Sequence, residues 1–153
     1  MPILIDGHNL IGQLPTISLS DPDDEEKLVH LLLSYRARTG RRIVVVFDPG
    51  EGFALRETRH LGGVEVVFAA HGSSADAVIS RRVRRSRDRA GWLVVTSDNR
   101  LAETVTRLGA RVQSAAEFAA GLGPEPEAPP DWKDMPLSPE EVESWLALFQ
   151  EKR

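Results

Sequence analysis

Two hydrophobic patterns alternate between residues 3 and 122: short continuous apolar runs, and longer segments in which apolar residues recur every three or four positions. Continuous short runs are typical of parallel strands covered on both faces, whereas the wider spacing is typical of amphipathic helices. Strands that alternate with helices favour a mostly parallel sheet with right-handed crossovers. The apolar runs predict strands over residues 3–6, 42–47, 64–68, 92–97 and 111–112.

Capping residues set the expected helix boundaries. Asp21 suits the N-cap of a helix with Pro22 at its first position, and Gly40 suits the position after the last turn of the same helix. A second helix is expected to begin near Ser73 and to end at Gly91. The remaining pattern predicts helices over residues 99–108 and 115–122, and loops over residues 7–20 and 48–52.

The last part of the chain has a different character. Residues 123–137 are rich in proline and acidic side chains, which is typical of a linker between a domain over residues 1–122 and a separate C-terminal element. Ser138, Pro139 and Glu141 then form a helix start with a capping box, which predicts an amphipathic helix over residues 138–153. We expect its apolar face to dock on the domain, or else to contact a partner or a second copy. This face comprises Val142, Trp145, Leu146 and Phe149.

Composition and charge narrow the possible chemistry. The absence of cysteine excludes disulfides and thiolate catalysis. The net charge of −4 hides an uneven distribution, because residues 124–153 hold eight acidic against three basic side chains, and residues 1–123 hold sixteen basic against fifteen acidic. No apolar run is long enough for a membrane span, and the first residues lead directly into a strand without a signal-peptide pattern. We therefore expect a cytoplasmic protein that does not contact a membrane.

Aspartates follow three of the predicted strands. Asp6, Asp48 and Asp98 each come directly after, or at the end of, an apolar run. Because ligands of open α/β sheets bind outside the carboxyl ends of the strands, these carboxylates are expected to meet at one edge. Any one of them could instead cap a helix or shape a turn, and Asp76, in the first turn of a helix, is favoured there by the helix dipole alone. Asn9 could bind a ligand or stabilise its own loop.

Clustered carboxylates repel one another, and a hard divalent cation relieves that repulsion. Mg²⁺ and Mn²⁺ take carboxylate and water oxygens, and can support hydrolysis of a phosphodiester without a histidine base or a covalent nucleophile. The acidic residues therefore predict a Mg²⁺ or Mn²⁺ site that hydrolyses phosphodiesters, with either one ion or two. The sequence shows no Walker motif, dinucleotide motif or nucleophile elbow.

Arginines gather on the second predicted helix and just beyond it. Only Asp88 interrupts the run, so the helix does not compensate the repulsion between these side chains internally. A solvated surface or a contact with the acidic C-terminal segment would also explain the run, but contact with phosphates is the interpretation we favour. The residues predicted to make this contact are Arg81, Arg82, Arg84 and Arg85, and the run continues with Arg87 and Arg89.

Several spaced motifs together resemble the YacP-like NYN domains, which belong to the wider PIN-like nuclease group. The resemblance extends over roughly residues 3–122, and its motifs occur in the order found in that family. It implies a PIN-like three-layer α/β/α fold with a mostly parallel sheet, and metal-dependent endoribonuclease activity. The phosphate-binding residues Arg81, Arg82, Arg84 and Arg85 would then be RNA-binding residues. The motifs are Asp6-Gly7-His8-Asn9-Leu10-Ile11, Phe47-Asp48, Ser74-Ala75-Asp76, Val94-Val95-Thr96-Ser97-Asp98 and Ser114-Ala115-Ala116-Glu117-Phe118.

Carried over by position, the resemblance implies a catalytic set of Asp6, Asp48, Asp76, Asp98 and Asn9, of which Asp6, Asp76 and Asp98 would bind the metal ion. The chain departs from the family pattern at two positions. His8 stands where many relatives have tyrosine, and Ala77 stands where relatives often have a second acid. Ala77 keeps a non-catalytic RNA-binding module open as an alternative, and a phosphohydrolase acting on a small phosphate ester is a second alternative.

Overall fold

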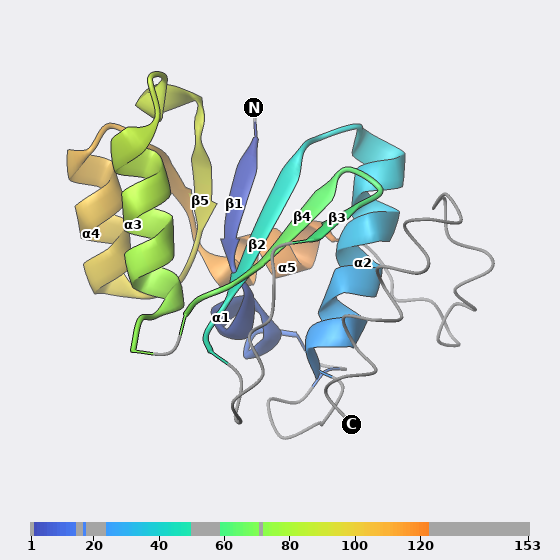
Figure 1. The fold of residues 1–153 in the computed structure, drawn as a ribbon. Coiled ribbons are helices and arrows are strands. Elements are labelled where there is room, and N and C mark those ends of the chain that lie inside the picture. Colours follow the sequence, from blue (N-terminus) through green and yellow to red (C-terminus); the bar gives the residue numbers. More distant parts are fainter. Residues whose placement is uncertain (1, 15–16, 18–23, 50–58, 71, 123–153) are drawn as a thin grey trace.

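The computed structural model of the chain describes residues 2–14, 17, 24–49, 59–70 and 72–122 (Figure 1). These residues form one six-stranded sheet with helices on both of its faces. The elements are β1 (Ile3–Asp6), α1 (Gly7–Ile11), α2 (Asp24–Thr39), β2 (Ile43–Phe47), β3 (Arg59–Leu61), β4 (Val64–Phe68), α3 (Ala75–Arg85), a 3-10 turn (Arg89–Gly91), β5 (Leu93–Val95), α4 (Asn99–Arg107), β6 (Arg111–Gln113) and α5 (Ala115–Gly121).

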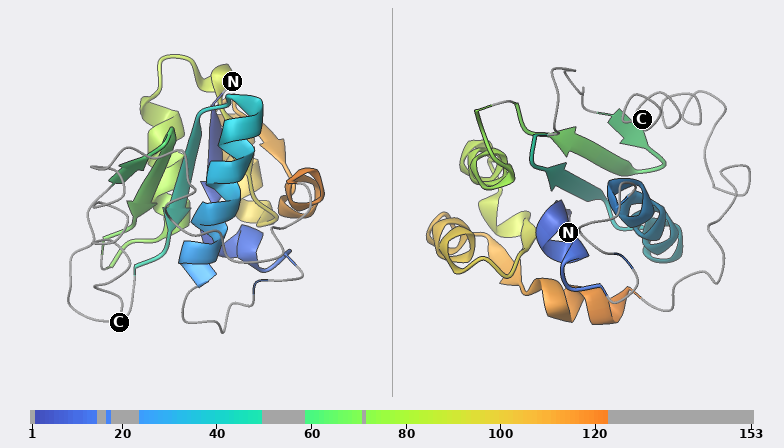
Figure 2. Two further views of the ribbon diagram at one scale, coloured as in Figure 1. Left: turned by 90° about the vertical axis from the view of Figure 1, so that its right-hand side faces the viewer. Right: turned by 90° about the horizontal axis from the view of Figure 1, so that it is seen from below.

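The sheet has the strand order β3-β4-β2-β1-β5-β6. All neighbouring strands are parallel except β3, which pairs antiparallel with β4. Helices α3 and α4 cover one face of the sheet, and α2 and α5 cover the other (Figures 1 and 2). The predicted three-layer α/β/α class with a mostly parallel sheet is therefore confirmed.

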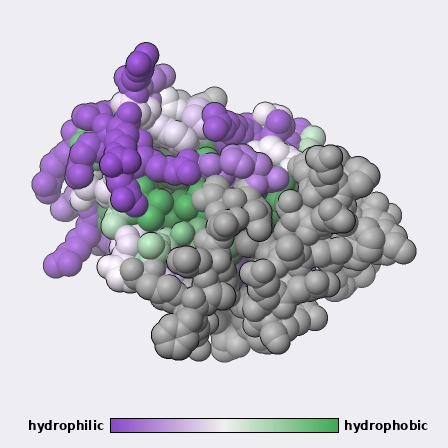
Figure 3. Space-filling view, in the orientation of Figure 1, coloured by the Kyte–Doolittle hydropathy of each residue, from purple (hydrophilic) through white to green (hydrophobic). Residues whose placement is uncertain are grey.

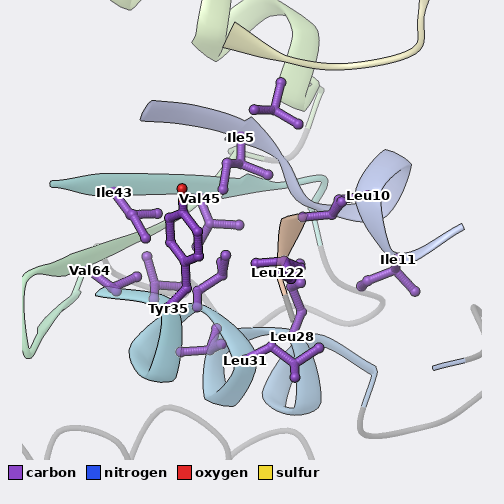
Figure 4. Packing of buried hydrophobic residues seen from close by; sticks show 14 of the residues in the cluster. Ile5, Leu10, Ile11, Leu28, Leu31, Tyr35, Ile43, Val45, Val64 and Leu122 are labelled. Atoms are coloured by element: carbon purple, nitrogen blue, oxygen red, sulfur yellow. The ribbon is translucent and has the colours of Figure 1, made fainter. Parts of the chain in front are cut away.

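The strands divide the core into two layers because successive side chains point to opposite faces of a sheet. On β1, Ile3 and Ile5 join the cluster under α2, whereas Leu4 joins the cluster under α3 and α4. Figure 4 shows the first cluster, in which Tyr35 of α2 lies against the sheet. Both faces of β1 and β2 are buried. Packing on each side therefore holds the carboxyl ends of these two strands in place.

Helix α1 is a correction to the sequence analysis, which expected a loop over residues 7–20. The helix begins at Gly7, directly after β1, and buries Leu10 and Ile11 against the core. A Cβ atom at Gly7 would lie 2.4 Å from the Phe47 ring, so only glycine allows this close approach of the chain to β2. The sequence pattern for α1 is weak because the helix is only five residues long and depends on tertiary contacts.

Two further predictions differ from the structure. The helix expected from Ser73 to Gly91 ends at Arg85, because Ser86 is extended and Asp88 caps the separate 3-10 turn. Ala90, which the expected helix would have included, is consequently exposed, whereas Ala75, Ile79 and Val83 on α3 are buried. Strand β3 was not predicted, because three residues carry almost no periodicity.

Some predictions concern residues outside the described ones. These are the N-cap at Asp21 with Pro22, the turn at residues 50–52, the linker over residues 123–137 and the amphipathic helix over residues 138–153. The described part of α2 does end as predicted, with Gly40 in a left-handed conformation at φ 72° and its N–H bonded to the Arg36 carbonyl. Within the described residues, no helix combines the length and the apolar character that crossing a membrane requires.

Candidate active site

The carboxyl edge of the sheet brings the predicted aspartates together. Asp6 ends β1, Asp48 follows β2, and Asp98 follows β5 as the N-cap of α4, on three strands that are neighbours in the sheet. Asp76 lies in the first turn of α3, which starts at the same edge. We call these four residues the acidic edge. Residues separated by more than ninety positions in the sequence thus meet because parallel strands all end on one side.

Asp6 is the most buried member of the acidic edge, with an exposed fraction of 6%. Burial is the main cause that raises the pKa of its carboxyl from 3.8 to about 6, and the negative charges of Asp76 and Asp48 raise it further. Hydrogen bonds from the Thr96 hydroxyl and from the Asn9 backbone N–H oppose this change in the pKa. The carboxylate form of Asp6 is therefore destabilised by its surroundings at neutral pH.

Asp76 has the same kind of electrostatic environment. Its pKa is raised first by burial, then by the charges of Asp98 and Asp48, and by a hydrogen bond with the Asp98 side chain. The charges that act on Asp6 and Asp76 therefore come from separate segments of the chain. A cation placed among them would relieve this repulsion.

Asp98 is both a helix cap and a member of the acidic edge, the two interpretations that the sequence left open. Its Oδ1 atom accepts hydrogen bonds from the backbone N–H groups of Arg100 at 2.8 Å and Leu101 at 3.3 Å, which makes it a helix cap. It also affects the pKa of Asp76, which places its carboxyl at the acidic edge. The capping interpretation was therefore correct, and it does not exclude a part in the site.

Asn9 is engaged with the backbone. Its side-chain oxygen accepts a hydrogen bond of 2.7 Å from the N–H of Ser97, between β5 and α4. This bond joins α1 to the loop that carries Asp98. The structure thus favours the interpretation in which Asn9 stabilises loops at the acidic edge, while its backbone N–H contacts Asp6.

Asp48 is held by two elements. Its Oδ1 atom accepts a hydrogen bond of 2.9 Å from the backbone N–H of Ala75, the first residue of α3. Its Oδ2 atom lies 3.4 Å from Nδ1 of His8, whose Nε2 atom lies 3.2 Å from the buried carboxylate of Glu25 on α2. These two carboxylates, with Glu25 as the larger influence, raise the pKa of His8 although its burial acts in the opposite direction.

Three side chains that contribute to this arrangement, Thr96, Glu25 and His8, were not predicted to do so from the sequence. Thr96 is buried, and its hydroxyl bridges two acids, because it donates to Asp6 at 3.4 Å and accepts from the backbone N–H of Asp98 at 3.1 Å. Glu25 and His8 form a chain of contacts that reaches Asp48. A polar residue at the end of an apolar strand was the available signal for Thr96, whereas no local pattern marks Glu25 as a partner of His8.

The chemistry of the acidic edge suits a hydrated magnesium or manganese ion. The described residues contain no group of three or more acidic, histidine or cysteine side chains close enough to enclose a metal ion directly. Mg²⁺ does not require such a cage, since it keeps several waters and is usually held by one or two carboxylates and by substrate phosphates. Four mutually repelling carboxylates, two of them with raised pKa values, fit that mode of binding.

The predicted RNA-binding arginines lie further along α3, and we call Arg81, Arg82, Arg84 and Arg85 the arginine flank. Arg82 forms an ion pair of 2.6 Å with Glu65 on β4, so its charge is largely compensated. Arg81, Arg84 and Arg85 are exposed. Arg87 and Arg89 fall beyond the end of α3, and the Arg89 guanidinium donates to the Arg84 carbonyl.

Comparison with known proteins places these features in a family. Residues 3–128 match the model of the YacP-like NYN domain. The chain is 30% identical over 123 residues to the YacP protein of Bacillus subtilis strain 168, an alignment that covers 76% of this chain and 71% of that protein.

A solved structure of a protein from the same organism is also similar. The crystal structure of Rae1 (YacP) from Bacillus subtilis matches with a TM-score of 0.67 and 26% identity, over 80% of this chain and 73% of that one. A single-substitution variant of Rae1 matches with a TM-score of 0.64, again at 26% identity and over 80% of this chain and 74% of that one.

Proposed function

The chain belongs to the YacP-like NYN domain family, and from this premise we propose that it is a divalent-metal-dependent endoribonuclease. The family relationship supports a nuclease-type, RNA-related function. The observation that carries the proposal is the acidic edge, where carboxyl groups from three strand ends and one helix start meet. There the charges of Asp48 and Asp76 raise the pKa of Asp6, and those of Asp48 and Asp98 raise the pKa of Asp76. Without a cation, repulsion within such a cluster lowers the stability of the fold. A purely structural role of these carboxyl groups therefore does not account for the cluster.

The residues that would hold Mg²⁺ or Mn²⁺ are Asp6, Asp76 and Asp98, with Asp48 beside them. When bound, such an ion lowers the pKa of an attacking water and stabilises negative charge on the leaving oxygen of a phosphodiester. Thr96 fixes the Asp6 carboxyl by a hydrogen bond, and the capping bonds of Asp98 fix its position at the start of α4. The Ala75 N–H and His8 hold the Asp48 carboxyl, so all three strand-end acids are oriented before substrate arrives.

One specific observation favours a second candidate, a non-catalytic RNA-binding module. Ala77 is exposed directly after Asp76, so the chain lacks an acidic side chain at a position next to the cluster. In that case the acidic edge would bind a cation without supporting hydrolysis, and the arginine flank would bind RNA.

Incubation of the full chain with mixed structured and unstructured RNAs separates the two candidates. We expect internal cleavage with Mn²⁺ or Mg²⁺, and intact RNA in excess chelator. Isothermal titration with Mn²⁺ in the absence of RNA measures metal binding independently of cleavage. Manganese binding and RNA binding without cleavage would select the non-catalytic module, and cleavage that persists in chelator would overturn the proposal.

A further inference from the structure

A groove runs along α3 on the side that faces β4. Its volume is about 560 Å³, within the range of about 300–1,000 Å³ that is usual for sites of small ligands. It exists because α3 packs against β1 and β2, and β4 lies one strand further out in the sheet. The described residues that line it are Val67, Phe68, Ala70, Val78, Arg81, Arg82, Arg85, Ser86 and Trp92.

The groove has an apolar floor and a basic rim. Val67 and Val78 belong to the core layer beneath it, and Trp92 packs against the same layer. Figure 3 shows apolar surface in a hollow on the face turned to the viewer, bordered by strongly hydrophilic residues. A surface of this kind matches a ligand that is flat and apolar in one part and negatively charged in another.

The charges on the rim are of two kinds. Arg82 is compensated by Glu65 on β4. Arg81 and Arg85 form no ion pair with any residue that the structure describes, and both are available to an anion. Arg84, on the same helix turn as Arg85, does not line the groove.

The groove and the acidic edge lie along the same helix, α3. Asp76 lies in the first turn of α3, and Val78, Arg81, Arg82 and Arg85 follow it along the axis. At a rise of about 1.5 Å per residue, Arg82 lies about 9 Å and Arg85 about 13 Å from Asp76 along the helix. A strand bound at the acidic edge can therefore reach the groove within a few nucleotides.

We propose that this groove is a subsite for one unpaired nucleotide of the RNA substrate. The base lies on the apolar floor, and the neighbouring phosphates lie against Arg81 and Arg85. The inference rests on the proposed function, because RNA is the substrate that extends from the acidic edge. It adds a substrate class, single-stranded RNA, because bases in a duplex are stacked and paired and do not enter a lateral groove.

The test uses the full chain in excess chelator, so that binding is measured without cleavage. The probe is a single-stranded RNA of about eight nucleotides, in which one abasic position is moved stepwise along the strand. The wild-type chain should lose about tenfold in affinity when the abasic site falls at one internal position, since stacking of one base contributes about that factor. At other positions the loss should be small.

Two pairs of variants assign that position to the groove. Ala70 is exposed and lines the groove, so Ala70→Trp fills it, and Ala116→Trp on the opposite face of the sheet is the matched control. Ala70→Trp should weaken binding of the intact strand about tenfold and abolish the position dependence, whereas Ala116→Trp should do neither. Arg85→Ala should weaken binding more than Arg84→Ala, although the two side chains are adjacent and equally charged.

The outcomes distinguish this inference from the proposed function. Cleavage by the wild-type chain together with Ala70→Trp behaving like Ala116→Trp would overturn the groove and leave the nuclease intact. A positional abasic effect that is lost in Ala70→Trp, in a chain that never cleaves RNA, would support the groove and overturn the nuclease. If Ala70→Trp lowers the melting temperature while RNA binding is unchanged, the groove holds part of the chain itself and the inference is wrong.

Discussion

Helix α3 carries two regions that are organised in opposite ways. At its first turn Asp76 is half-buried among carboxyl groups from three strand ends, and burial raises the pKa values of Asp76 and Asp6. Toward its last turn Arg81 and Arg85 extend into solvent along the groove. The acidic edge consists of one buried and three partly buried carboxyl groups, and we expect the effect of each to depend on its position. On the arginine flank the charges are more exposed, so we expect smaller effects there, larger for Arg85, which lines the groove, than for Arg84.

The largest expected effect is on cleavage at the acidic edge. Asp98→Asn removes the charge but keeps a good helix cap, because asparagine caps as well as aspartate. We expect cleavage to fall by about a thousandfold, since charge stabilisation around a metal contributes several kcal/mol to such reactions. Rates of RNA cleavage in Mn²⁺ test this, with the exposed acid substitution Glu117→Gln as the control. Equal rates of RNA cleavage by the two variants would show that Asp98 takes no part in the reaction.

The second prediction concerns the cost of the buried carboxylate. A carboxyl whose pKa rises from 3.8 to about 6 on folding stabilises the fold below pH 4, and this contribution is lost as the pH rises through 6. Above pH 7 the ionised form costs about 3 kcal/mol in the absence of metal. Asp6→Asn should therefore raise the free energy of unfolding by about 1–3 kcal/mol at pH 7.5 and change it little at pH 4.

Denaturant unfolding in chelator at the two pH values measures this difference. Burial lowers the pKa of His30 to about 4 in the folded state. As the pH falls below 6.5, the unfolded state therefore binds a proton at His30 before the folded state does, and the fold becomes less stable. The comparison must therefore be made between Asp6→Asn and the wild type at each pH. A gain of the same size at pH 4 and pH 7.5 would show that the charge of Asp6 is not its cause.

The arginine flank should respond more gradually. The double substitution Arg81→Ala with Arg85→Ala removes two phosphate contacts, each of which contributes about −0.7 to the slope of log affinity against log salt concentration on single strands. The slope should become shallower by about 1.4, for all sequences alike. Titrations of fluorescent RNA over a series of salt concentrations measure it, with Arg107→Ala on α4 as a control. An unchanged slope would mean that these arginines only face solvent.

The smallest effect is expected from the acidic C-terminal segment. Residues 124–153 carry eight acidic and three basic side chains, so their removal takes away negative charge that competes with RNA for the arginine flank. Truncation after Gly123 should tighten RNA binding a few-fold at low salt and less at high salt. If the predicted amphipathic helix docks on the domain, the same truncation also lowers the melting temperature of the monomer. Unchanged melting with a changed oligomeric state would instead indicate a partner or a second copy.

The sequence predicted the parts of the fold that repeat a physical rule. Apolar runs of strands buried on both faces and capped helices of several turns were found, and the rule for strand ends placed Asp6, Asp48 and Asp98 at one edge. The end of α3 was missed because arginines continue past Arg85 with no change in polarity, while Ser86 leaves the helix conformation. Charge patterning alone does not reveal such a boundary.

The missed contributors to the site share a different cause. Glu25 meets His8, and Thr96 meets Asp6, across long separations in the sequence that only the folded sheet brings together. Helix α1 likewise forms because Gly7 allows the chain to pass close to Phe47. Interactions of this kind are specified by packing between elements, so a single sequence without its structure offers no local signal for them.

Within the part of the chain that the structure describes, the sheet ends in a three-residue strand at each edge, β3 on one side and β6 on the other. Short edge strands offer few unpaired backbone groups to another chain. Exposed polar or charged side chains on them, such as His60 and Arg111, further disfavour the addition of a strand from another chain. The central strands, which would aggregate readily if exposed, are therefore shielded from strand addition. We expect the folded chain to resist fibril formation at the high concentrations used for titrations.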